Sequence, residues 1–373
     1  MKQLIALLMA LLMLFSLTAC GGGEKTPAEP GPTDVVYVSP TPAAEPAQPL
    51  MPKEEFEALS AEEIVEKLTR GADSTDEDLL QLHRYAVYGE LNDSAAVLLP
   101  AHLMGAVERL DTEYGVKITS GDVLVDAFAA AEEPILRIYL AQIVYDVLDR
   151  TSPEALSQIA ELIRNDPDET VRAGVLLASQ LLAKASDDIY SAILDAANDK
   201  SVLVRRNLPA ALQFSAGKED AQATLKALLS DSDAVVQARA GFQLAKQGDS
   251  SCLPQITALL QDPKVPEDDR GLVHQQVALS LVTLSGTERH GQELYVEEAY
   301  DACLSYLRQV DAENMAFNTI ADAFGKLPDD YAANAPWYDP NEVIEAITYA
   351  KDNAERSTIR NFAEQDLAKL TQP

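Results

Sequence analysis

Residues 236–248 decide the fold of this chain. They read Val-Gln-Ala-Arg-Ala-Gly-Phe-Gln-Leu-Ala-Lys-Gln-Gly. Val236, Ala240 and Leu244 follow one another at four-residue steps, so they lie on one face of a helix. The segment therefore predicts an amphipathic helix that must bury one side against another element.

The same pattern recurs along the chain. Segments in the same phase begin at a shared first position: Leu136, Val171, Val204, Val236, Val273, Ala316 and Ile359. The steps between these positions are 35, 33, 32, 37, 43 and 43 residues. Five of the seven segments have Asp five residues before the first position: Asp166, Asp199, Asp231, Asp268 and Asp311. Repetition at this period predicts an array of similar structural units.

Each regular unit also contains an earlier amphipathic segment, which makes two helices per unit. These segments are residues 153–164, 188–197, 219–229 and 251–260. One helix pair cannot bury its apolar faces alone, so stacking of the pairs forms one continuous core. Strands do not alternate with helices in the sequence, which argues against a doubly wound sheet.

The recurring order of Asp, then Val-Arg, then small residues and a final Gly resembles the HEAT-repeat family in its short bacterial, PBS-lyase-type form. Residues 236–248 are the nearest copy, although Gln237 replaces the expected Arg. The resemblance covers residues 132–286, while residues 53–131 and 287–373 are helical in pattern and divergent, as capping units are. It implies an all-α superhelix whose second helices line a concave inner surface.

The first twenty residues resemble a bacterial lipoprotein signal. Lys2 precedes an apolar run over residues 4–15, which is too short to span a bilayer, and small residues lead to Cys20. The resemblance implies that residues 1–19 are removed and that Cys20 carries lipid and anchors the chain on the extracytoplasmic face of a bacterial cell membrane. Residues 21–52 contain eight prolines, so residues 20–52 are expected to form a disordered tether.

The charge excludes one class of partner. The chain of 373 residues has 29 Lys and Arg against 60 Asp and Glu, a formal net charge of −31. A nucleic-acid binder needs a surplus of basic residues, so none is expected. Lipid on Cys20 holds the chain on a membrane without help from its surface charge.

The recurring charged residues are assigned to architecture. In the family that the chain resembles, the Arg of each second helix and the Asp of each turn form a ladder between neighbouring repeats. That resemblance implies a structural role for Asp166, Arg172, Asp199, Arg205 and Asp231.

The third, fourth and seventh positions of each second helix are the candidates for binding a partner. They provide a polar strip of Arg206, Asn207, Arg239, Gln275 and Gln276 beside an apolar row of Leu177, Phe242 and Leu279. Such a surface suits an extended or helical peptide. The alternative is an apolar row packed inside the array and a polar strip that is only solvated.

Two aromatic residues on a proline-bounded loop, Trp337 and Tyr338, are a further candidate contact patch. The alternative is that they pack against the last helix pair. Cys252 and Cys303 are expected to be buried thiols, although a disulfide between them is also compatible with the sequence.

Catalytic and metal-binding motifs are missing from the sequence. The four histidines are isolated, and no phosphate-binding loop, dinucleotide-binding turn or nucleophile elbow is present. The chain is therefore predicted to be a non-catalytic protein- or peptide-binding scaffold without a cofactor. The alternatives are an envelope spacer without a specific partner and a lyase-like enzyme of the HEAT type.

Overall fold

The computed structural model describes residues 117–132, 137, 140, 141, 144, 151–184, 186–215, 217–288 and 294–370. The chain divides into two compact units, Met1–Ser152 and Pro153–Pro373. The predicted signal peptide, Cys20, the tether and most of the N-terminal flank lie outside the described residues. In the first unit, Ser120 caps the start of α6 (Gly121–Ala130), and its side chain accepts a hydrogen bond from the amide of Val123.

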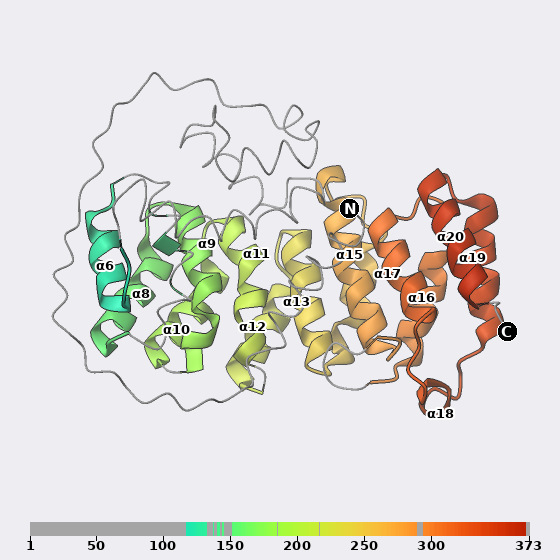
Figure 1. Cartoon of the computed structure of the whole chain (residues 1–373), viewed down its shortest axis with the longest axis horizontal. Coiled ribbons are helices and arrows are strands. Elements are labelled where there is room, and N and C mark those ends of the chain that lie inside the picture. Colours follow the sequence, from blue (N-terminus) through green and yellow to red (C-terminus); the bar gives the residue numbers. More distant parts are fainter. Residues whose placement is uncertain are drawn as a thin grey trace, which may run out of the picture. The chain divides into compact units, whose positions relative to one another are not determined.

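The second unit consists of stacked helix pairs. In the described part of this unit the pairs are α8 (Pro153–Asn165) with α9 (Glu169–Ala178), α10 (Asp187–Asp195) with α11 (Val202–Ala211), α12 (Glu219–Leu228) with α13 (Ala234–Lys246), α14 (Leu253–Leu259) with α15 (Glu267–Leu284), α16 (Glu297–Leu307) with α17 (Asn314–Phe324), and α19 (Pro340–Asn353) with α20 (Ser357–Leu370). Figure 1 shows the pairs following one another from α8 to α20. The short helix α18 (Tyr331–Asn334) lies between the last two pairs.

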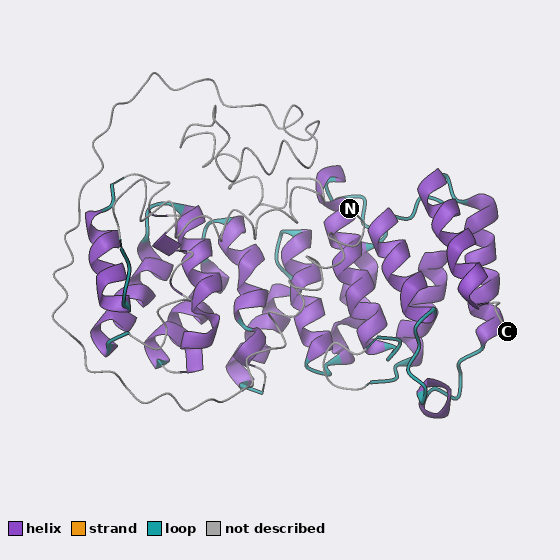
Figure 2. Ribbon diagram, viewed as in Figure 1, coloured by secondary structure: helices purple, strands orange, loops and turns teal. Residues whose placement is uncertain are grey.

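Every described element is a helix, and no strand occurs among the described residues (Figure 2). The prediction of an all-α array of helix pairs is therefore confirmed for this part of the chain. The first positions of the repeats are its core: the side chains of Val171, Val204, Val236, Val273, Ala316 and Ile359 are all fully buried.

Local sequence signals fix the ends of the helices. Asp168 and Asp233 accept hydrogen bonds from the amides at the starts of α9 and α13, which leaves fewer donors unpaired at those ends. Gly217, Gly248 and Gly286 follow second helices and have positive φ angles of 87°, 82° and 76°. At Gly286 a Cβ atom would also lie 2.3 Å from the carbonyl oxygen of Leu294, so only glycine fits this turn.

The two rows of helices pack differently. Each second helix packs against the next along the whole row, from α9 through α11, α13, α15 and α17 to α20. Among the first helices, extensive packing of this kind occurs between α8 and α10 and between α16 and α19. The second helices therefore form the more closely packed row.

Candidate functional site

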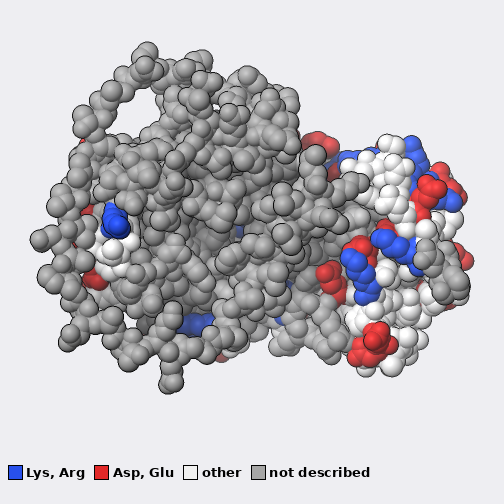
Figure 3. Space-filling view, in the orientation of Figure 1, with Lys and Arg blue, Asp and Glu red and all other residues white. Residues whose placement is uncertain are grey.

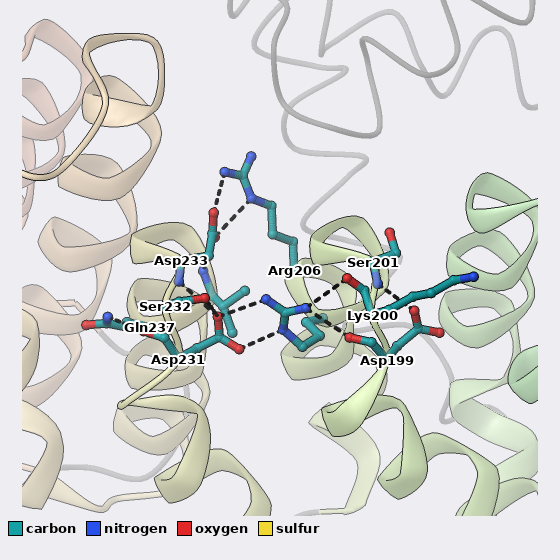
Figure 4. A network of polar contacts seen from close by, with 10 residues as sticks. Asp199, Lys200, Ser201, Arg206, Asp231, Ser232, Asp233 and Gln237 are labelled. Carbon is teal, nitrogen blue, oxygen red and sulfur yellow. Dashed lines mark hydrogen bonds and ion pairs between the residues drawn. The ribbon is translucent and has the colours of Figure 1, made fainter.

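Ion pairs between neighbouring repeats connect the turns of the array. The Arg172 guanidinium donates from Nε and Nη2 to the two carboxylate oxygens of Asp199, at 2.8 and 3.0 Å. One repeat later, Arg205 binds the carboxylate of Asp231 in the same way, at 2.8 and 3.2 Å, in the network drawn in Figure 4. These bidentate pairs are largely buried, and they raise the pKa of Arg172 and of Arg205.

The same side chains also bind the turn that precedes their own helix. Arg172 and Arg205 each donate from Nη1 to the carbonyl oxygen six residues earlier, at 2.8 and 2.9 Å. Gln237 makes the equivalent bond to Asp231 at 2.6 Å, so it keeps the contact within its repeat but has no charge for a pair. The six-residue contact recurs from Arg137 to Ala131 and from Arg360 to Ala354.

His274 occupies the equivalent position in α15 and makes a neutral contact instead. Its Nδ1 lies 2.9 Å from the hydroxyl of Tyr306 on α16, which accepts a hydrogen bond from the amide of Glu313 at 3.0 Å. Burial lowers the pKa of His274. A neutral imidazole thus connects these two repeats.

The third position of the second helices differs from the expectation in three of the four regular repeats. Ala173, Arg206 and Ala238 are buried there, because a second helix packs against its own first helix and against both neighbouring second helices, whereas Gln275 is partly exposed. The Arg206 guanidinium binds both carboxylate oxygens of Asp233, at 3.0 and 2.7 Å, and Asp269 on α15 at 2.7 Å. Placing Arg206 on a solvent-facing strip is therefore wrong: the side chain cross-links three repeats.

The fourth and seventh positions keep access to solvent. Gly174, Asn207, Arg239 and Gln276 at the fourth position are all partly exposed. At the seventh position Leu177 is 36% exposed, while Ala210, Phe242 and Leu279 are partly exposed. Two of the predicted polar side chains are held by their surroundings, since Asn207 donates to Leu203 at 2.9 Å and Gln275 donates to Thr319 of α17 at 3.0 Å.

Arg239 is a partly buried cation next to the Arg206 network. It donates from Nη1 to the carbonyl oxygen of Arg206 at 2.8 Å. Burial lowers the pKa of Arg239 to about 10, and the charge of Arg206 adds to this effect, while Asp233 and Asp269 oppose it. The side chain therefore stays protonated at neutral pH, but in surroundings that disfavour its charge.

The aromatic loop packs on the C-terminal helices. The Trp337 ring centroid lies 4.9 Å from that of Tyr300 on α16, and the Tyr338 ring lies 5.2 Å from that of Tyr331. Both side chains are nevertheless partly exposed. Over these C-terminal helices, acidic and basic side chains are interspersed (Figure 3), with pairs such as Lys369 with Asp366 at 2.7 Å.

No cluster of three or more His, Cys, Asp or Glu side chains suited to a metal ion occurs in the part of the chain that the structure describes. Cys252 and Cys303 are free, buried thiols, and burial raises the pKa of each to about 12. A cavity of about 560 Å³ between α14 and α16 has Glu298 as the one carboxylate in its lining.

No described helix is long and apolar enough to cross a membrane.

Comparisons with known proteins give low similarities. No protein-family model matches the chain, and no curated protein matches its sequence. Among solved structures, the Escherichia coli protein YibA is 18% identical, with a TM-score of 0.39, over 85% of this chain and 95% of that one. Human deoxyhypusine hydroxylase, solved in complex with glycerol, is 14% identical, with a TM-score of 0.27, over 84% of this chain and 96% of that one.

Proposed function

We propose that this chain is a non-catalytic scaffold that binds a peptide segment of a partner protein along its row of second helices. The observation that carries the proposal is the exposure of the fourth and seventh positions on consecutive helices α9, α11, α13 and α15. Apolar side chains at one position and polar groups at the other offer pockets and hydrogen bonds to an extended or helical peptide.

The packing of the helices supports the choice of this face. In a curved stack, the helices of the inner row lie closer together than those of the outer row. The second helices are the more closely packed row, which supports assigning them to the concave side, the usual binding surface of such arrays.

The proposed location is the extracytoplasmic face of a bacterial membrane, with lipid on Cys20 and a proline-rich tether that gives the folded part reach. Thirty-two residues of extended chain span about 100 Å at ~3.1 Å per residue. A partner within that distance of the membrane is accessible to the scaffold.

In-cell photo-crosslinking tests the binding proposal. A crosslinking amino acid is placed at Leu279 on the second-helix row and, as the matched control, at Ala223, an exposed position on the first helix α12. We expect a discrete crosslinked protein from position 279 and none of that size from position 223. Diffuse products from both positions would overturn the proposal in favour of an envelope spacer.

A further inference from the structure

Charge is segregated between the two rows of helices. The first helices α8, α10 and α12 together contain seven acidic and two basic residues. The second-helix segments 171–184, 202–215, 234–246 and 270–284, called here the acid-free segments, contain no acidic residue and seven basic residues. The chain as a whole has a net charge of −31. In four consecutive repeats, however, the second helix has no carboxylate beyond its first turn.

Ion pairs occupy four of these seven basic side chains. Arg172, Arg205 and Arg206 bind the aspartates of the turns, and Arg270 pairs with Glu267 at 3.4 Å. The other three, Lys184, Arg239 and Lys246, have no carboxylate partner within the described parts of the chain.

Two of these three cations share one stripe of α13. Arg239, Phe242 and Lys246 lie three and four residues apart and are all partly exposed. The two cations are therefore separated by about 10 Å along the helix axis, at ~1.5 Å per residue. The Lys246 ammonium lies 5.6 Å from the centre of the Phe242 ring. The third cation makes a similar contact: the ammonium of Lys184, which follows α9, lies 5.1 Å from the centre of the ring of Phe214, which follows α11.

We infer that the segment bound by these second helices is acidic and amphipathic, with carboxylates that pair with Arg239 and Lys246 and apolar side chains that pack between them. This inference rests on the function proposed above and names the chemistry of the partner. Charge complementarity carries it, because an acidic peptide is repelled by the first helices α8, α10 and α12 and meets no carboxylate along the acid-free segments.

The surroundings of the two cations favour such a ligand. Burial lowers the pKa of both Arg239 and Lys246. The carboxylates of Asp233 and Asp269 offset this effect only in part at Arg239, and neither cation forms an ion pair with a described carboxylate. A peptide carboxylate supplies the missing counter-charge in a site that is already partly desolvated. A flat anionic bilayer fits less well, because a partly buried guanidinium cannot reach a planar surface.

Synthetic peptides test the inference. The probes are 14-residue peptides that share one amphipathic pattern of leucines and carry Glu, Gln or Lys at every polar position. Fluorescence anisotropy measures their binding to the full mature chain at low and high salt. We expect the Glu peptide to bind at least tenfold more tightly than the Gln peptide, the Lys peptide to bind least, and added salt to reduce the difference.

Variants assign the preference to this surface. Arg239→Gln combined with Lys246→Gln is expected to remove the Glu-over-Gln preference. Lys226→Gln is the control on the first-helix row, since Lys226 is an exposed cation on α12 that already pairs with Asp249 at 2.8 Å, and it is expected to keep the preference. Equal binding of Glu and Gln peptides, or a preference that survives the double variant, would overturn the inference.

Two further readouts separate the alternatives. Binding of the unlipidated chain to vesicles containing phosphatidylglycerol, lost in the double variant, would replace the peptide with a membrane surface and overturn the inference. A second outcome is that the double variant keeps the partner that is crosslinked from position 279 in the unaltered chain. That outcome would agree with the scaffold function and contradict only the preference for an acidic segment. Absence of that partner in the unaltered chain would instead contradict the scaffold function itself.

Discussion

At the scale of single residues, Arg172 shows how one side chain connects two repeats. Its side chain is 4% exposed, and its guanidinium is bound to the Asp199 carboxylate and to the carbonyl of Asp166. Arg172→Leu would leave the Asp199 carboxylate without its counter-charge, so we expect the free energy of unfolding to fall by about 3–5 kcal/mol. Urea denaturation followed by circular dichroism measures the loss.

Arg172→Gln is the informative companion to that variant. Gln237 shows that an amide at this position keeps the bond to the carbonyl six residues earlier. We therefore expect Gln to lose about 1 kcal/mol less than Leu. Equal losses for the two variants would contradict a contribution from the carbonyl bond.

The buried His274 makes stability depend on pH. Burial lowers its pKa from the ordinary value of 6.5, with Arg270 and Arg356 adding to this effect and Glu313 and Asp311 opposing it. The unfolded chain therefore binds more protons than the folded chain below about pH 6.5, and stability is lost as the pH falls through and below that value.

The test compares urea midpoints from pH 8 to pH 5 for the unaltered chain and His274→Gln. The variant is expected to be less stable at pH 8, because it loses the contact with Tyr306, and to depend less on pH between 7 and 5. Parallel profiles would assign the pH dependence to other groups.

At the scale of the elements, close contact between α13 and α14 depends on Gly241. A Cβ atom at this position would lie 2.2 Å from Cγ2 of Ile256. Gly241→Ala is therefore expected to cost about 1–3 kcal/mol, and combining it with Ile256→Ala should cost less than the sum of the two single changes.

Gly271→Ala is the control for that series. Gly271 lies inside α15, and a Cβ atom there meets nothing within 4 Å. We expect this change to stabilise the chain by about 0.4–1 kcal/mol, because alanine reduces the freedom of the unfolded chain. Destabilisation by both glycine changes would show that backbone conformation, and not contact with Ile256, decides the result.

The second helices show what periodicity predicts and what it leaves out. A four-residue pattern starting at Val236 identifies the buried face correctly, because one apolar stripe is the signature of one packed side. The same pattern predicts that the third position of each second helix faces solvent, although Arg206, the third residue counted from Val204, is buried. The helix has neighbours on three sides, and contacts with other repeats depend on stacking geometry that a single helix does not encode.

At the scale of the whole molecule, the proposed attachment to the membrane rests on one residue, Cys20, which lies outside the described parts. Cys20→Ser removes the thiol that would receive lipid, and two or three acyl chains hold a protein firmly on a membrane. We expect the variant to leave the membrane fraction and to lose labelling by an alkyne-tagged fatty acid. Membrane retention without the label would contradict the lipid anchor.

The sequence predicts the helix pairs of the array even beyond its regular repeats. Ala316 and Ile359 follow at irregular steps of 43 residues, yet each is fully buried at the equivalent place in its helix. The longer steps arise from inserted segments, which change the spacing without changing the phase. The pair formed by Arg206 and Asp269, 63 residues apart, has no such signal, because it follows from how three repeats stack.

That pair has a mechanical consequence. In an array whose repeats contact only their neighbours, each interface between repeats bends independently of the others. Arg206 reaches past α13 to Asp269 on α15, so it links two repeats that are not neighbours. Bending of the array under load should therefore concentrate on either side of α11–α15, while the repeats that carry Arg239 and Lys246 keep their arrangement.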